Sequence, residues 1–254
     1  MKSRANAAGA PPGAAADFHG FPEEGFRFLR QLKQHNDRDW FRERKTGYEQ
    51  HVEQPMRALV LAVARQCQAR GLPLHAKDKH PVMRVYRDIR FSKDKRPFKT
   101  HVSAELRRSF SDCGNMLYIH VSPDESFVAA GVWRPERPLL HAWRQAIVNG
   151  PARFEKICTA LAKRGLELNR EHSLSSMPRG FQNYSQESFG PWLKLTSFVV
   201  HRRFERSDCM TPEFLKSVVD FAMSVKPLLD FGWRVEEAHT ERSKKVIPEA
   251  EFFF

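Results

Sequence analysis

The residues best suited to chemistry lie in one short basic stretch, MRVYRDIRFSKDKRPFKTH, from Met83 to His101. Its seven basic residues are Arg84, Arg87, Arg90, Lys93, Lys95, Arg96 and Lys99, and its only acidic residues are Asp88 and Asp94. Guanidinium and ammonium groups bind phosphate oxygens through charge-assisted hydrogen bonds. The stretch therefore predicts either an anion site or a network of ion pairs within the fold.

The first interpretation is a planar anion site built from Arg84, Arg90 and Lys95. On an extended strand, residues two apart lie about 7 Å from each other on the same face, so Asp88 can hold the Arg90 guanidinium in place. The second interpretation is structural. Arg87 falls on the otherwise apolar face, where an unpaired charge is costly, so we expect it to be buried, paired and able to fix strand register together with Asp88.

Two aromatic residues belong with this cluster. Tyr86 lies on the polar face between Arg84 and Asp88, and Trp133 ends a later strand, where it could line the mouth of a cleft. Aromatic rings beside cations stack on nucleobases in single-strand binders. The predicted ligand-binding residues are Arg84, Tyr86, Arg87, Asp88, Arg90, Lys93, Lys95, Lys99, His101 and Trp133.

Catalysis is a separate hypothesis. Asp88 or Asp94 could perform acid–base work on a phosphate ester if folding brings either one beside His101 or His120. The sequence contains no phosphate-binding Walker loop, no glycine-rich dinucleotide motif and no G-x-S-x-G. The spacing therefore leaves open whether the protein is an enzyme and names no catalytic residue.

The spacing of metal-ligating residues predicts no metal site and no cofactor. The cysteines, Cys67, Cys113, Cys158 and Cys209, include no C-x-x-C pair, and the 11 histidines include no H-E-x-x-H or H-x-H. We expect the cysteines to be reduced and to pack in the core.

The charge balance predicts the class of partner. Lysine plus arginine exceeds aspartate plus glutamate by 42 − 30 = 12, a surplus that attracts polyanions such as nucleic acid or a phosphate-bearing ligand. The longest apolar run, residues 58–64, is far shorter than the roughly 18 residues that a membrane span needs. The N-terminus lacks the apolar core of a secretory signal, so we expect a cytoplasmic protein with no membrane partner. The oligomeric state is left open.

Periodicity indicates which elements position these residues. Helical spacing predicts a helix over about 22–34, a second that begins at an N-cap at Asn36, Asp37 or Asp39 and carries Tyr48, and a third over about 55–67. Two more are predicted within 135–165, and a closing helix over about 211–233. Alternation from Val82 to Phe91 and in three later runs predicts a four-stranded antiparallel meander over about 82–133, and residues 196–204 predict one more strand. Residues 166–191 predict a long ordered loop.

These elements predict a single α+β domain whose central antiparallel sheet is covered by N-terminal and C-terminal helices. The expected boundaries are a disordered tail at 1–17, the domain at 18–235, and a poorly structured tail at 236–254. Enough of the sequence is apolar, 41%, for one sizeable core.

The basic stretch also resembles a known family. RVYRDIRFSKDKRPF is similar to the signature RxxRDxRFxxx[DN]KxxY of a bacterial family of conserved hypothetical proteins, with Phe98 where the signature has Tyr. The segments NDRDWF (36–41), GVWRPE (131–136) and, more loosely, PRGF (178–181) are similar to the same family. The resemblance covers most of the chain and implies no established activity.

From the residues, we infer a cytoplasmic anion-binding protein whose ligand carries phosphate, with nucleic acid as the first candidate. A phosphate-processing enzyme with an Asp/His pair beside the cluster is one alternative. A non-catalytic scaffold for protein interactions is another. The direction in which the basic side chains and the two histidines point separates these functions.

Overall fold

The computed structural model describes residues 17–109 and 114–246, with the side chains of 243–246 excepted. The predicted N-terminal tail and Cys113 therefore lie outside the described residues, apart from Asp17. Within the described part, the chain folds as the α+β domain that the sequence predicts: a five-stranded antiparallel sheet packed against helices.

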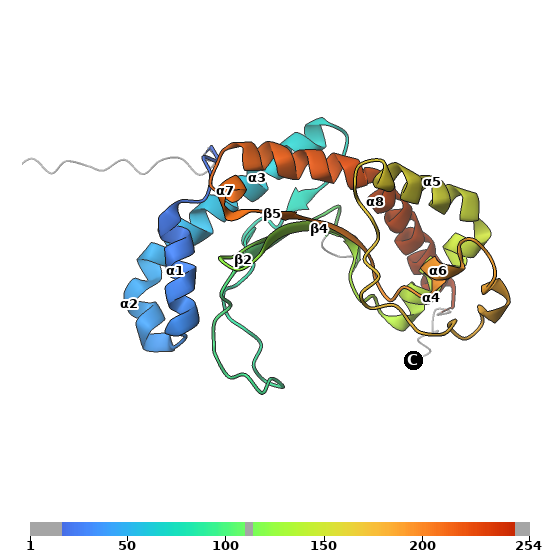
Figure 1. Cartoon of the computed structure of the whole chain (residues 1–254), viewed down its shortest axis with the longest axis horizontal. Helices are drawn as coiled ribbons and strands as arrows, with labels where there is room; N and C mark the ends of the chain where they lie inside the picture. The colour runs from blue at the N-terminus through green and yellow to red at the C-terminus, as the bar shows by residue number, and fades with distance from the viewer. Residues whose placement is uncertain (1–16, 110–113, 247–254) are drawn as a thin grey trace, which may run out of the picture.

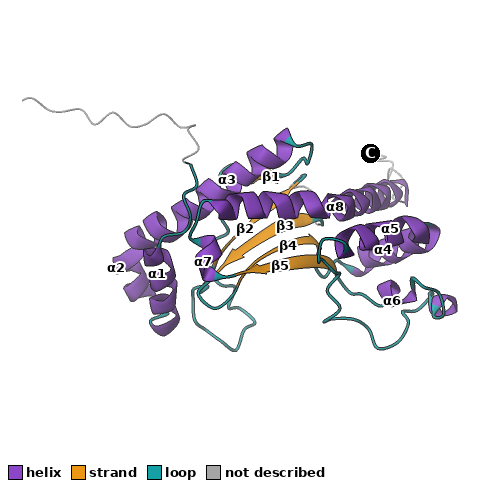
Figure 2. Cartoon of the chain, turned by 45° about the horizontal axis from the view of Figure 1, so that its top comes forward, coloured by secondary structure: helices purple, strands orange, loops and turns teal. Residues whose placement is uncertain are grey.

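The sheet is a meander whose strand order follows the chain. Its strands are β1 (His75–Ala76), β2 (Val102–Arg107), β3 (Met116–Val121), β4 (Ser126–Val132) and β5 (Phe198–Phe204). All neighbours pair antiparallel in the order β1-β2-β3-β4-β5 (Figure 2). Strand β5 joins after a long excursion of the chain through helices and loops, and the prediction of a strand at residues 196–204 is confirmed.

Helices cover one face of this sheet and extend from both of its ends. The N-terminal group is α1 (Glu23–Gln34), α2 (Arg38–Tyr48), the π-helical turn η1 (Glu49–Glu53) and α3 (Gln54–Ala69). The later elements are α4 (Arg137–Asn149), α5 (Pro151–Ala162), η2 (Gln182–Tyr184), α6 (Gly190–Leu193), α7 (Arg206–Cys209) and α8 (Glu213–Val246). Figure 1 shows an arch, with α3 and α8 over the convex side of the sheet and its concave side uncovered by helices.

The core lies between the sheet and helices α3 and α8. The sheet contributes alternate residues, each at most 1% exposed: Val102, Ala104, Leu106, Leu117, Ile119, Val121, Val128 and Ala130. Burying each large aliphatic side chain stabilises the fold by about 1.5–3 kcal/mol. Under α4 and α5 the core continues through aromatic rings, where Trp143 stacks on Phe198 with centroids 4.5 Å apart. The alternate residues on the other face of the sheet are left free to form a site.

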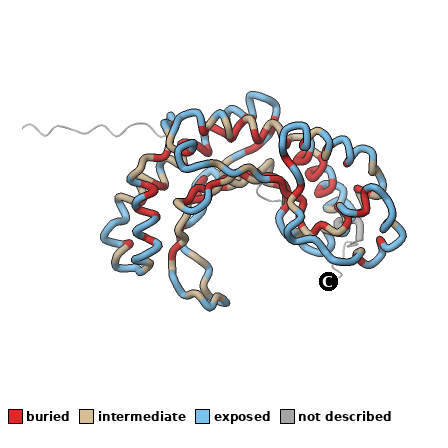
Figure 3. The backbone as a smooth tube through the Cα atoms, in the orientation of Figure 1, coloured by how far each residue is buried: buried red, intermediate tan, exposed pale blue. Residues whose placement is uncertain are grey.

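The predicted strand at residues 82–91 is wrong. Val82 makes an isolated bridge to Ala104 of β2, and the chain then leaves the sheet and returns at Val102. Within this excursion one isolated bridge, Tyr86–Phe98, pairs the two sides. We call residues 83–101 the basic arm. It projects from β2 on the concave side of the sheet (Figure 1) and is largely exposed or half-buried (Figure 3). The alternation seen in the sequence is therefore that of a projecting hairpin.

The closing helix is longer than the sequence predicted. Residues 236–246, which we expected to be poorly structured, continue α8, and Pro227 lies inside the helix. Glu236 fixes this part of the helix to the sheet, because its Oε1 accepts hydrogen bonds from the backbone N–H and the Nδ2 of Asn115, both at 2.7 Å. Residues 247–254 lie outside the described residues.

The long segment between α5 and β5 is an ordered loop, as predicted, with two short helical turns, η2 and α6. A buried arginine holds its end in place. Arg144, 8% exposed, donates from Nε to the carbonyl of Leu193 at 2.8 Å and from Nη2 to the carbonyl of Leu195 at 3.1 Å. These bonds satisfy the guanidinium with backbone oxygens, so the loop reaches β5 along a fixed path.

Candidate functional site: a basic arm beside a groove on the sheet

The arm contains two ion-pair clusters of its own. Asp94 accepts from Arg87 Nη1 at 2.6 Å and from Arg96 Nη2 at 2.7 Å, and Asp88 accepts from Arg90 Nη2 at 2.7 Å and Nε at 3.0 Å. Hydrogen bonds from Arg96 and then Arg87 hold the pKa of Asp94 well below its usual range. The predicted pairing of Asp88 with Arg90 is confirmed.

The expectation that Arg87 is buried is wrong, although it is paired. Its side chain is 28% exposed, because the arm has left the sheet and no apolar layer covers it. Both ion-pair clusters join residues of the arm to each other, so they stabilise the shape of the hairpin. They do not fix the register of the sheet.

Four cations of the arm form no ion pair with a carboxylate in the described part of the chain: Arg84, Lys93, Lys95 and Lys99. Of these, Arg84 lies close enough to Asp88 for its charge to lower the pKa of that carboxyl, after the larger effect of the Arg90 hydrogen bonds. Lys95 donates from Nζ to the carbonyl of Ile89 at 3.0 Å, a contact that leaves its charge uncompensated. Burial, and then the nearby Arg84 charge, lower the pKa of Lys99. A site that accumulates unpaired like charges favours an anionic ligand.

The aromatic residues of the arm differ in exposure between its tip and its root. Phe91, which we expected on the apolar face of a strand, is 96% exposed at the tip, with the Arg90 guanidinium 5.9 Å from its ring centre. Tyr86 is half exposed and packs on Phe98, with ring centroids 5.2 Å apart. The tip therefore presents a bare aromatic ring among cations.

The root of the arm is fixed to the N-terminal helices. The Asn36 side chain bonds the backbone of Phe98 twice, with Nδ2 donating to the carbonyl at 3.1 Å and Oδ1 accepting from N–H at 3.0 Å. The Phe98 ring is buried and stacks on Phe41 at 4.2 Å. The next residue, Asp37, caps α2 by accepting from the backbone N–H groups of Asp39 and Trp40. The segment at 36–41 thus positions the arm.

His101 and His120 do not join the acidic residues of the arm. Their rings lie 4.1 Å apart, and His120 stacks on Phe127 at 4.7 Å. Burial lowers the pKa of His101 to about 4 and that of His120 to about 3, and neighbouring positive charge adds to both shifts. Both imidazoles are therefore neutral at pH 7. In the described residues, Asp88 and Asp94 contact arginines and the two histidines contact each other, so no Asp/His pair is formed.

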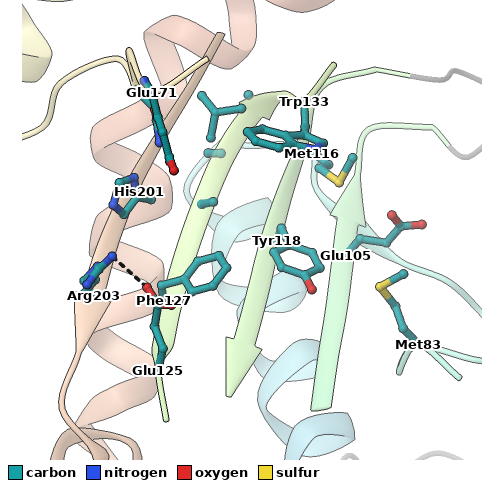
Figure 4. A pocket seen from close by; sticks show the side chains of 15 residues that line it. Met83, Glu105, Met116, Tyr118, Glu125, Phe127, Trp133, Glu171, His201 and Arg203 are labelled. Atoms are coloured by element: carbon teal, nitrogen blue, oxygen red, sulfur yellow. Dashed lines mark hydrogen bonds and ion pairs between the residues drawn. The ribbon is translucent and has the colours of Figure 1, made fainter. Parts of the chain in front are cut away.

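The concave face of the sheet forms a groove with a cavity volume of about 630 Å³. Its lining comes from β2 to β5, the arm root and the long loop: Met83, Glu105, Met116, Tyr118, Glu125, Phe127, Ala129, Ala130, Gly131, Trp133, Asn169, Glu171, Val199, His201 and Arg203 (Figure 4). This volume lies within the range of roughly 300–1,000 Å³ that is typical of small-molecule sites.

Strand register explains why this face is hollow. Across the sheet, Glu105 pairs with Tyr118, Tyr118 with Ala129, and Ala129 with His201. The next row places Gly131 beside Val199. Gly131 has a positive φ of 123°, and a Cβ there would collide with the Phe198 carbonyl oxygen. Strand β4 therefore supplies small residues between larger neighbours, and they form the floor of the groove.

The groove carries both carboxylates and cations. Glu105 accepts from Arg107 Nη2 at 3.0 Å, and Glu125 pairs with Arg203 at 3.0 Å. Glu171 is exposed and has no ion-pair partner in the part of the chain that the structure describes. Burial raises the pKa of Tyr118, which keeps its hydroxyl protonated at neutral pH. The groove thus offers hydrogen-bond acceptors beside aromatic rings.

Of the predicted site residues, Trp133 lies on the groove, as expected for the mouth of a cleft. Arg84 follows Met83, which also lines it, so the arm root meets the groove wall. Arg90, Lys93 and Lys95 lie farther along the arm. Sequence reasoning missed Glu105, Tyr118, Glu171, His201 and Arg203, because they come from different strands and a loop. For the four strand residues, their polar positions in alternating strands were the available signal.

Within residues 17–109 and 114–246, we found no three acidic, histidine or cysteine side chains grouped so that they could hold a metal ion. The same residues contain no helix with the length and apolar character needed to cross a bilayer.

Comparison with protein families matches the chain to the family described as "Conserved hypothetical protein (DUF2461)", over residues 24–231. The chain belongs to the DUF2461 family. The match spans the arm, all five strands of the sheet and most of α8, so the arm and the groove belong to one DUF2461 domain. Neither the curated proteins nor the solved structures gave a match.

Proposed function

We propose that this DUF2461 protein is a cytoplasmic nucleic-acid-binding protein whose basic arm contacts the phosphate backbone. The observation that carries the proposal is the set of four arm cations without carboxylate partners, Arg84, Lys93, Lys95 and Lys99. Nucleic acid supplies the compensating charge, because each phosphate neutralised by a cation releases counter-ions into solution. The free thiols of Cys67, Cys158 and Cys209 suit the reducing environment of the cytoplasm.

The distribution of these cations favours a polymer over a small phosphorylated metabolite. They are spread along a projecting hairpin, from its root at Arg84 to the far side of its tip, and are not gathered in a closed pocket. Small ligands are usually enclosed in concave sites that cover most of their surface. The phosphate backbone of an extended nucleic-acid strand can contact cations that are spread out in this way. The exposed Phe91 ring beside them offers a stacking surface for a base.

Salt dependence of binding tests the proposal directly. Fluorescence anisotropy can measure the affinity for a labelled 20-nucleotide single strand and a 20-base-pair duplex between 50 and 300 mM KCl. If four phosphates are contacted, the slope of log affinity against log salt concentration should be about −3 for the single strand and −4 for the duplex. The variant with Gln at Arg84, Lys93, Lys95 and Lys99 should flatten the slope by about three units. Its melting temperature should change little, because Arg84, Lys93 and Lys95 are exposed, and the half-buried Lys99 has no ion pair to lose.

A matched control separates a site from the general charge of the protein. Gln at Arg65, Lys77, Lys156 and Lys163 removes four exposed cations outside the arm. This control should keep the wild-type slope. Equal loss of binding in both variants would show that only the net charge of +12 attracts the polymer. Binding of a mononucleotide as tight as that of the oligomer would indicate a small-ligand site and overturn the proposal.

A further inference from the structure

We propose that the groove on the concave face of the sheet binds one unpaired nucleobase, and that it selects a base with an exocyclic amino group: adenine, cytosine or guanine. This inference rests on the proposed function, since the arm would hold the phosphates next to that base. It assigns the groove a ligand class and a selectivity that the arm alone does not have.

The walls of the groove suit a flat aromatic ligand. Trp133 is 48% exposed, and the half-buried rings of Tyr118 and Phe127 point into the same hollow (Figure 4). The thioether side chains of Met83 and Met116 complete this lining. Stacking a base on an exposed indole buries the apolar faces of both partners, and every base has such a face. The aromatic lining therefore supplies affinity without specifying which base enters.

The carboxylates supply the selectivity. Glu105 and Glu171 line the cavity from opposite sides, Glu105 on β2 and Glu171 on the long loop (Figure 4). An ionised carboxylate only accepts hydrogen bonds, so it favours the amino groups of adenine, cytosine and guanine. At the equivalent position, thymine and uracil present a carbonyl oxygen, which a carboxylate repels. Arg107 holds the Glu105 carboxylate in place with a 3.0 Å bond.

The arm and the groove are joined at the root of the arm. Met83 lines the groove and Arg84 follows it, so their Cα atoms are about 3.8 Å apart. A nucleotide with its base in the groove would therefore have its phosphate close to the first unpaired cation of the arm. The Arg203 guanidinium also lines the groove, where it is paired with Glu125.

Binding of matched oligonucleotides tests this assignment. The four ligands are single strands of 12 nucleotides: oligo-dC, oligo-dA, oligo-dT and an abasic strand. The wild type should bind dC and dA about tenfold more tightly than dT, and it should bind the abasic polymer most weakly. Trp133→Ala should weaken dC and dA about tenfold and leave the abasic polymer unchanged. Trp133→Phe should restore most of the affinity, since it retains a stacking face.

Glu171→Ala should reduce the preference for dC over dT to about twofold. The matched control, Glu187→Ala, removes an exposed carboxylate of the same loop outside the groove and should keep the tenfold preference. If all four polymers bind equally in the wild type and Trp133→Ala changes nothing, the groove assignment fails while the function of the arm stands.

A probe without phosphate separates the two proposals completely. Cytidine and adenosine, titrated by NMR at millimolar concentration, should shift signals of groove residues, and thymidine should not. If no oligonucleotide binds but these nucleosides do, the proposed function fails and the base site stands. If tetramethylammonium binds in the groove and the nucleosides do not, the groove is a cation site and the inference is overturned.

Discussion

The two aspartates of the basic arm determine which of its cations are available to a ligand. Asp88 and Asp94 together engage three arginines, Arg87, Arg90 and Arg96, at 2.6–2.7 Å. Paired guanidinium groups shape the hairpin, and the remaining cations carry its uncompensated charge. At this scale the arm combines a structural set of charges with a set that can bind an anion.

The Arg87–Asp94 pair should contribute modestly to stability. Both side chains are about a third exposed, at 28% and 35%, so solvent screens their attraction. Arg87→Met should therefore lower the free energy of unfolding by about 1 kcal/mol or less, as measured by urea denaturation. A loss of 3 kcal/mol or more, the value for a broken buried pair, would show that the arm packs more tightly in solution.

The paired histidines on the sheet predict an acid-sensitive fold. The pKa values of His101 and His120 in the folded state, about 4 and about 3, lie below the ordinary value of 6.5, so the unfolded chain binds more protons as the pH falls below 6.5. Their contribution to stability is complete above about pH 6.5 and is lost as the pH falls toward 4. Each residue contributes at most about 1.4 kcal/mol per pH unit, reduced by solvent access.

Chemical denaturation at pH 7.0 and pH 4.5 measures this loss. The double variant His101→Gln and His120→Gln should show a clearly smaller loss between these two values. An unchanged pH dependence in the double variant would assign the acid sensitivity to other groups.

Among the elements, the link between α1–α2 and the arm consists of the Asn36 side chain, which bonds the Phe98 backbone, and the stacking of Phe98 on Phe41. Asn36→Ala removes both bonds to the Phe98 backbone, which is part-buried, and should lower the free energy of unfolding by about 2 kcal/mol. Asn36→Asp retains the acceptor for the Phe98 N–H and loses the donor, so it should cost about half as much. Hydrogen exchange at the Phe98 amide should accelerate most in the alanine variant. Unchanged exchange there would show that ring stacking alone holds the arm.

The helices and strands β2 to β5 could be predicted because their apolar residues recur with the correct period and face one core. The segment at 82–91 shows the limit of that signal. Its alternation is real, but a strand also needs a neighbour along its length, and after Val82 the chain finds only isolated bridges. At residues 236–246 the sequence predicted too little structure. Contacts such as that of Glu236 with Asn115 extend α8 into a polar segment that was expected to be poorly structured.

The candidate site was predictable only in its local part. The pairing of Asp88 with Arg90 follows from their spacing, and the position of Trp133 at the end of a strand placed it at a cleft. The groove depends on strand register. Glu105 and His201 are almost a hundred positions apart, and only the pairing of four strands brings them to the same row. Sequence periodicity predicts which face of the sheet a side chain lies on, but it does not predict which residues of other strands lie beside it.

For the molecule as a whole, the arch carries the arm as an appendage outside its core. The contacts of the arm with the core end at Val85 and Phe98, which are both buried. Replacing residues 87–97 with an Asn-Gly turn should therefore close the hairpin at the Tyr86–Phe98 bridge.

The melting temperature of this variant should stay within about 4 °C of the wild type. Its affinity for a 20-nucleotide single strand should fall part of the way to that of the four-site Gln variant, because Lys93 and Lys95 are removed while Arg84 and Lys99 remain. Loss of cooperative unfolding would show that the arm is part of the core. Retained affinity would place the nucleic-acid contacts elsewhere.

The strand order has a kinetic consequence. Strands β2, β3 and β4 are joined by short connections, so the chain loses little entropy when they pair, whereas β5 must return after the whole excursion from residue 132 to 198. We expect β5 to dock last during refolding. Pulsed hydrogen exchange should protect the amides of Leu117 and Val128 before those of Val200 and Arg202. One wall of the groove, with His201 and Arg203, would then be missing from the folding intermediate, leaving the edge of β4 open to a second chain.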